Sequence, residues 1–104
     1  MTVSEQRHFQ RAEIDVSLTF VLKGKTDVFQ GSARDLSIGG MFVETATPAP
    51  FNAEVVVSLV LPGASELSQL PGRVRWGRGG GMGVQFGLLG ARETHLIAAL
   101  TSKK

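Results

Sequence analysis

The chain has 104 residues, of which 42% are hydrophobic and 19% charged, and this ordinary globular composition indicates one domain and excludes disordered or collagen-like architecture. It has no Cys and only two His, which excludes disulfide frameworks, thiolate zinc sites and cysteine nucleophiles and leaves little for a catalytic base. The net charge of +2 lacks the dense basic character of a polymer-binding protein and suits a site where a few Arg side chains meet a small anion.

The first eleven residues are polar apart from Met1, Val3 and Phe9, and they precede the first clear strand pattern. Such a segment can bury little apolar surface against the rest of the domain, so residues 1–11 are predicted to form a mobile arm. The arm lacks the apolar stretch of a secretory signal, and no apolar run in the chain approaches the roughly 20 residues that span a bilayer. We therefore expect a cytoplasmic protein without a membrane span.

Short alternating runs punctuated by Gly and Pro follow the arm, as is typical of an all-β barrel or sandwich. The clearest run predicts a strand with one buried face, formed by Ile14, Val16, Leu18, Phe20 and Leu22. A turn at 24–27, a second strand at 28–34, a loop at 35–40 and a third strand at 41–45 come next. The Val-rich run 54–61 is apolar on both faces, which predicts a central strand.

Two further strands, at 69–76 and 82–86, are predicted on either side of a glycine-rich hairpin turn, and the period then changes to that of a helix at 89–101. The sequence therefore predicts a single domain over 1–104, all-β with one C-terminal helix. In this prediction residues 12–88 form a six-stranded antiparallel β-barrel, whose closure removes exposed strand edges.

Two segments carry residues that strand and core formation do not account for. The first carries Arg7 and Arg11, and the second runs Asp35-Leu36-Ser37-Ile38-Gly39-Gly40. Guanidinium binds phosphate or a guanine edge bidentately, and a carboxylate accepts hydrogen bonds from guanine. A small hydroxyl adds a donor and an acceptor, and glycines permit close backbone approach and positive φ. Together these groups suit a ligand with guanine bases and phosphates, although a solvated Arg pair and a simple Asx turn are the alternatives for each motif alone.

These motifs, in this order on this β pattern, resemble the signature of the PilZ domain, the bacterial receptor module for cyclic di-GMP. That signature is an RxxxR motif, here Arg7 and Arg11, followed by a [D/N]xSxxG motif, here Asp35, Ser37 and Gly40. The similarity extends through DLSIGGMFVET at 35–45, GRVRW at 72–76 and GMGVQF at 81–86.

The resemblance implies a six-stranded barrel with a C-terminal helix, in agreement with the strand pattern. It also implies that Arg7 and Arg11 grip guanine and phosphate from the arm, that Asp35 and Ser37 contact a guanine, and that the glycines shape the turn. The residue before the first Arg influences whether such domains bind one nucleotide or an intercalated pair, and Gln6 leaves this open.

Two side chains on the fifth strand, Arg73 and Arg75, are predicted to share a solvated face opposite Val74 and Trp76. That placement favours packing of Trp76 in the core or at the barrel edge over a role as a ligand platform. One of the two Arg side chains remains a candidate for assisting a phosphate.

We therefore expect a cyclic di-GMP receptor that relays the nucleotide level to an unidentified protein partner in trans, as its arm becomes ordered. No catalytic residue, metal or cofactor is expected, because neither His lies in a recognisable triad or metal motif. A nucleic acid polymer is not an expected partner, since that requires a basic groove with exposed aromatics. The alternative is a PilZ-like protein–protein adaptor with little or no nucleotide binding, although such members usually lose one of the two motifs.

Overall fold

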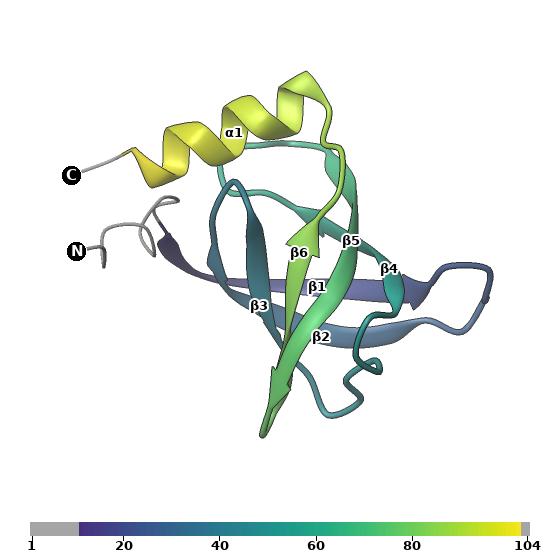
Figure 1. Cartoon of the computed structure of the whole chain (residues 1–104). Helices are drawn as coiled ribbons and strands as arrows, with labels where there is room; N and C mark the ends of the chain where they lie inside the picture. Colours follow the sequence, from purple (N-terminus) through teal and green to yellow (C-terminus); the bar gives the residue numbers. More distant parts are fainter. Residues whose placement is uncertain (1–10, 103–104) are drawn as a thin grey trace.

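The computed structural model describes residues 11–102 of the chain, which form six strands and one helix. The elements are β1 (Ala12–Leu22), β2 (Phe29–Leu36), β3 (Gly40–Glu44), β4 (Glu54–Val60), β5 (Leu67–Arg78), β6 (Gly81–Phe86) and α1 (Ala91–Thr101). The strands close into an antiparallel barrel in the order β1-β2-β3-β6-β5-β4. In Figure 1, β1 and β2 run crosswise to β3, β5 and β6, and α1 lies over one end. The predicted fold is confirmed.

The core is the inside of this barrel, filled by alternate residues from every strand. On β1, Leu18 and Phe20 are buried while the intervening residues face outward, as their period of two predicts. Phe20 lies opposite Phe29 on β2, and their rings stack with centroids 5.4 Å apart. At the end of the barrel, α1 contributes the fully buried Ile97. Leu96 and Leu100 of the same helix pack against the core beside it, so α1 covers this end of the barrel.

Three register shifts interrupt the strand pairing, on β1 between Glu13 and Val16, on β2 and on β5, and the last two bear on sequence predictions. On β2, Arg34 is the extra residue between Ala33 and Asp35, so Asp35 belongs to the strand and not to the predicted loop at 35–40. Gly40 likewise begins β3. On β5, the pairing moves from Val74–Val84 to Trp76–Gly83, which leaves Arg75 as an extra residue.

The β5 bulge turns Trp76 to the outside of the barrel. Val74 is 1% exposed and Trp76 is 44% exposed, so these two residues do not share a face. Arg73 and Trp76 instead lie opposite Gln85 and Gly83 on the outer surface. The predicted placement of Trp76 on the face of Val74 is therefore wrong, because one extra residue reverses the orientation of the side chains after it, whereas Arg73 and Arg75 do face solvent as predicted.

The predicted central strand 54–61 also differs from the structure. In β4 the residues Val55, Val57 and Leu59 are buried, whereas Val60 is 43% exposed. A closed barrel gives each strand two neighbours but leaves one face of each strand toward solvent. Apolar residues on the outer face of β4 therefore lie on the barrel surface.

Candidate functional site

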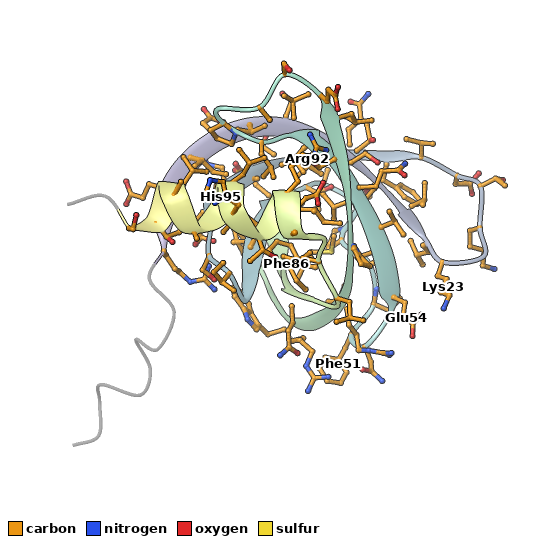
Figure 2. All side chains as sticks on the ribbon, turned by 90° about the horizontal axis from the view of Figure 1, so that it is seen from above. Lys23, Phe51, Glu54, Phe86, Arg92 and His95 are labelled. Carbon is orange, nitrogen blue, oxygen red and sulfur yellow. The ribbon has the colours of Figure 1, made fainter. Side chains whose placement is uncertain are left out.

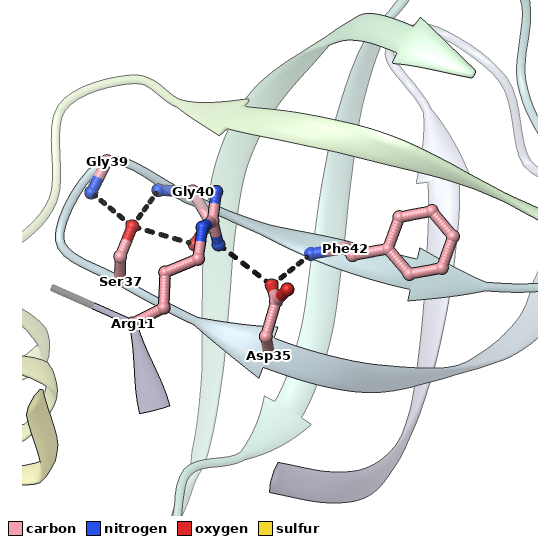
Figure 3. A network of polar contacts seen from close by, with 6 residues as sticks. All are labelled: Arg11, Asp35, Ser37, Gly39, Gly40 and Phe42. Atoms are coloured by element: carbon pink, nitrogen blue, oxygen red, sulfur yellow. Dashed lines mark hydrogen bonds and ion pairs between the residues drawn. The ribbon is translucent and has the colours of Figure 1, made fainter. Parts of the chain in front are cut away.

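Arg11 and Asp35 meet at the outer surface where β1 begins and β2 ends. The Nη1 of Arg11 lies 2.8 Å from Asp35 Oδ1, which also accepts a hydrogen bond of 2.9 Å from the backbone N–H of Phe42 (Figure 3). The bulge at Arg34 allows this arrangement, because Asp35 stays at the surface while Ala33 and Leu36 on either side are buried. Asp35 thereby joins the start of β1 to β3.

Ser37 holds the tight turn between β2 and β3. Its side chain is 1% exposed, and its Oγ accepts hydrogen bonds from the N–H groups of Gly39 and Gly40 at 3.1 and 3.3 Å (Figure 3). The backbone N–H of Ser37 donates to the carbonyl oxygen of Gly40 at 2.8 Å and closes the turn. The Ser37 hydroxyl thus satisfies the N–H groups of Gly39 and Gly40. These bonds fix the conformation of the turn without a ligand.

Gly40 is required by close packing. A Cβ at this position would collide with the carbonyl oxygen of Val84, because Gly40 lies close against β6, with which β3 is paired. The sequence suggested that Gly39 and Gly40 supply positive φ, but neither is among the described residues with positive φ, which include Gly24, Gly63 and Gly80. The glycine pair therefore brings backbone close to backbone.

An aromatic shelf, formed by Phe42 and Trp76, lies on the outer surface beside this turn. Both residues pair with Gly83 of β6, one from each side, and their rings stack with centroids 5.5 Å apart and an interplanar angle of 13°. A Cβ at Gly83 would lie within 2.5 Å of Trp76 Cζ2 and Nε1. Gly81 lies similarly under the Phe42 ring. The two rings meet across β6 because these glycines have no side chains to separate them.

The turn and part of the shelf line one shallow cleft of about 400 Å³. This volume is at the lower end of the range for small-molecule sites. The cleft combines two guanidinium groups, an indole face, a carboxamide and backbone amides, and its lining residues are Arg11, Ser37, Gly39, Gly40, Met41, Arg75, Trp76, Gly83, Val84 and Gln85. Such a set can pair with anionic oxygens and stack against a planar ring.

Four of the six predicted site residues therefore lie in one cleft, and a fifth, Asp35, is joined to it through Arg11. The sixth, Arg7, and the rest of the predicted arm at 1–10 lie outside the described residues. Trp76, Gly83 and Gln85 also line this cleft, and they were not predicted as site residues from the sequence. The signal was available in GRVRW followed by GMGVQF, since a Gly opposite an aromatic residue permits a ring to lie flat on the sheet.

A larger groove of about 1080 Å³ lies elsewhere, over β1, β2 and the adjoining ends of β3, β4 and β5. One of its described lining residues, Glu44, is charged, and Arg34 Nη1 pairs with that carboxylate at 3.0 Å. Its other lining residues are uncharged. The smaller cleft is the better anion site, because it has cationic side chains and this groove has none among the residues described.

Comparison with known proteins agrees with the geometry. The profile of the PilZ domain family matches residues 5–102, nearly the whole chain. The chain belongs to the PilZ domain family. No curated protein sequence matches it closely enough to assign a function by similarity.

Two solved structures share this PilZ fold at low sequence identity. The PilZ domain of CeSA from a cellulose-synthesizing bacterium is 22% identical with a TM-score of 0.70, over 88% of this chain and 93% of that one. The Bacillus subtilis inhibitor of motility, MotI/DgrA, is 13% identical with a TM-score of 0.74, over 92% of this chain but 49% of its own. These PilZ structures support the fold. Within residues 11–102, no helix is long and apolar enough to cross a membrane.

Proposed function

We propose that this PilZ domain binds cyclic di-GMP in the cleft formed by Arg11, the β2–β3 turn, Arg75 and Trp76. The observation that carries the proposal is the convergence of two arginines and an exposed indole on one turn that is held by Ser37. A cyclic dinucleotide presents two phosphates and two flat bases. Guanidinium groups match the phosphates and guanine edges, and the indole offers a face for stacking.

Arg11 has donors left for a ligand while it pairs with Asp35. The contact with Asp35 uses one Nη1 hydrogen, and a guanidinium has five N–H donors in a planar fork. Asp35 therefore orients Arg11 over the cleft and neutralises part of its charge. We propose that Arg7 adds a third guanidinium, beside those of Arg11 and Arg75, from the segment ahead of β1, and that Asp35 and Ser37 contribute the remaining polar contacts.

Calorimetric titration with cyclic di-GMP is the test, with GMP and GTP as comparison ligands. Arg11→Ala should weaken binding by about ten- to a hundredfold, since a bidentate contact to guanine contributes about 1–3 kcal/mol. Arg11→Lys should restore little of the lost nucleotide affinity, because an ammonium keeps the charge but lacks the planar set of N–H donors of a guanidinium. Arg34→Ala is the matched control: Arg34 is equally exposed and also ion-paired, to Glu44, but lies outside the cleft.

We further propose that binding is relayed to a protein partner through ordering of residues 1–11. Addition of cyclic di-GMP should then slow hydrogen exchange in this segment and leave the exchange rates in β4 unchanged. If the wild-type protein binds no cyclic di-GMP, the receptor function is wrong and the domain is a PilZ adaptor. If it binds the nucleotide with unchanged exchange in residues 1–11, the receptor function stands and the relay is wrong.

A further inference from the structure

A second exposed aromatic side chain stands on the connection between β3 and β4. The N–H of Ala53 donates to the carbonyl oxygen of Pro50 at 3.1 Å, which closes a β-turn with Phe51 and Asn52 at its centre. Asn52 has φ +73°, as the third position of a type II turn requires, and Asn is among the few side chains that tolerate it. Phe51 occupies the corner of this turn and is 69% exposed.

This turn, residues 50–53, is bonded firmly to β5. The Asn52 N–H donates to Val74 O at 2.7 Å, and the Val74 N–H donates to Ala53 O at 2.9 Å. The Asn52 carbonyl in turn accepts a hydrogen bond of 3.1 Å from Arg73 Nη1. The backbone that presents Phe51 is thus held by three hydrogen bonds to β5. Because the turn is already ordered, little backbone entropy is lost when a partner covers this ring, and this favours binding.

The surroundings of Phe51 are cationic. Glu54 is paired with both Arg73 Nη2 at 2.5 Å and Lys23 Nζ at 3.1 Å, and Figure 2 shows Lys23, Glu54 and Phe51 on the same side of the barrel. Arg75, which follows the Val74 carbonyl that binds the turn, is exposed and has no ion pair among the described residues. Three cations and one carboxylate give this region a net charge of +2.

Two other exposed apolar side chains on connections between elements lack this combination. Val28 is 62% exposed and Leu88 is 93% exposed, and both are aliphatic residues in the connections before β2 and after β6. Single exposed aliphatic residues are common on soluble proteins and need no function. A rigidly presented aromatic ring in a region where cations outnumber carboxylates is the pattern of an interface anchor, since aromatic and Arg side chains dominate binding hot spots.

We propose that the Phe51 turn, with Lys23, Arg73 and Arg75, is the docking surface for an acidic segment of a protein partner. That segment supplies an apolar pocket or side chain for the phenyl ring, flanked by Asp or Glu carboxylates that match the net positive charge. The surface adjoins the nucleotide cleft through Arg75, which lines it. The inference rests on the proposed function for its coupling to nucleotide, but the docking itself is separable.

A peptide-display experiment tests the surface directly. A random dodecapeptide library is selected on the full-length protein and counter-selected on Phe51→Ala. The expected winners carry at least one large apolar residue flanked by Asp or Glu. Binding of a synthetic winner, followed by fluorescence polarisation, should weaken at least about tenfold in Phe51→Ala, the usual size of a hot-spot effect. It should also weaken as salt is raised, because exposed charge pairs are screened.

The matched controls are Val28→Ala and Leu88→Ala, which remove comparably exposed apolar side chains and should leave peptide affinity unchanged. Cyclic di-GMP titration of Phe51→Ala should give wild-type affinity, so loss of docking and loss of nucleotide binding are distinguishable. The proposal is overturned if the selection yields no sequence above background or if the winners are uncharged or basic. It is overturned equally if Val28→Ala weakens the peptide as much as Phe51→Ala does.

Discussion

The barrel holds two stacked aromatic pairs that are almost alike in geometry and opposite in setting. Phe20 and Phe29 stack at 5.4 Å inside the barrel, and Phe42 and Trp76 stack at 5.5 Å outside it. The inner pair joins neighbouring strands at directly opposite positions, whereas the outer pair reaches across β6 over Gly83. The inner rings are placed by burial of apolar surface. The outer rings are placed by a bulge on β5 and by the missing side chain of Gly83.

This difference separates stability from function. Phe20 is 1% exposed, so its contribution lies in the free energy of folding. Trp76 is 44% exposed and lines the cleft, so its contribution is expected mainly in the binding of a ligand. Substitutions in the inner pair should therefore act on unfolding, and substitutions in the outer pair should act mainly on nucleotide binding.

The largest expected effect is that of Phe20→Ala. Truncating a buried Phe leaves a cavity and lowers the free energy of unfolding by about 3–5 kcal/mol. A domain of this kind is stable by only about 5–15 kcal/mol, so the variant should approach unfolding at room temperature. Urea denaturation followed by circular dichroism measures the change. A loss below about 1 kcal/mol would contradict the role of the inner pair as the core.

In the outer pair, Trp76→Ala should reduce nucleotide affinity more than it reduces the stability of the fold. Stacking of one base on an aromatic side chain contributes about 1–3 kcal/mol, so cyclic di-GMP affinity should fall by about ten- to a hundredfold. The free energy of unfolding should change by about 0.5–1.5 kcal/mol, the contribution of one aromatic pair. Calorimetry and urea denaturation on the same sample give both numbers. Equal losses in binding and in stability would show that Trp76 acts only as scaffold.

Gly83→Ala should reach the same site indirectly. The new methyl group displaces the indole ring, and the loss of nucleotide affinity should be no larger than that of Trp76→Ala. Because both changes act through one ring, the double variant should bind about as weakly as Trp76→Ala alone, which a double-mutant cycle measures. Gly87→Ala is the control, since its nearest neighbour lies 3.8 Å from the added Cβ. Additive losses would separate Gly83 from Trp76.

The two pairs also mark what the sequence could predict. The alternation around Phe20 predicted its strand, its face and the barrel to which it belongs, because a period of two needs no knowledge of the rest of the chain. The same rule applied to Val74 and Trp76 placed the indole on the wrong face, since a bulge is decided by pairing with a distant strand. The Arg11–Asp35 contact spans 24 residues and was not predicted, because the resemblance to the family implied only that both residues contact the ligand.

The smallest expected effect is electrostatic and belongs to the outer surface alone. A hydrogen bond from Lys23, together with the charges of Lys23 and Arg73, holds the pKa of Glu54 below its usual value of 4.5. Between the lowered pKa and 4.5, the unfolded chain binds a proton at Glu54 that the folded chain does not. The stabilisation from this carboxylate is therefore complete above pH 4.5 and is lost as the pH falls through the folded pKa.

Carboxyl-detected NMR should accordingly place the titration midpoint of Glu54 below 4.5 and return it toward 4.5 in Lys23→Gln. Over the same pH range the ring signals of Phe20 and Phe29 should stay unchanged, because the inner pair is held by packing. The backbone signals of Phe51 and Asn52 should move with Glu54, since protonation frees Arg73, whose guanidinium bonds both the carboxylate and the turn. If Glu54 titrates at or above 4.5 in the wild-type protein, this network does not organise the outer surface.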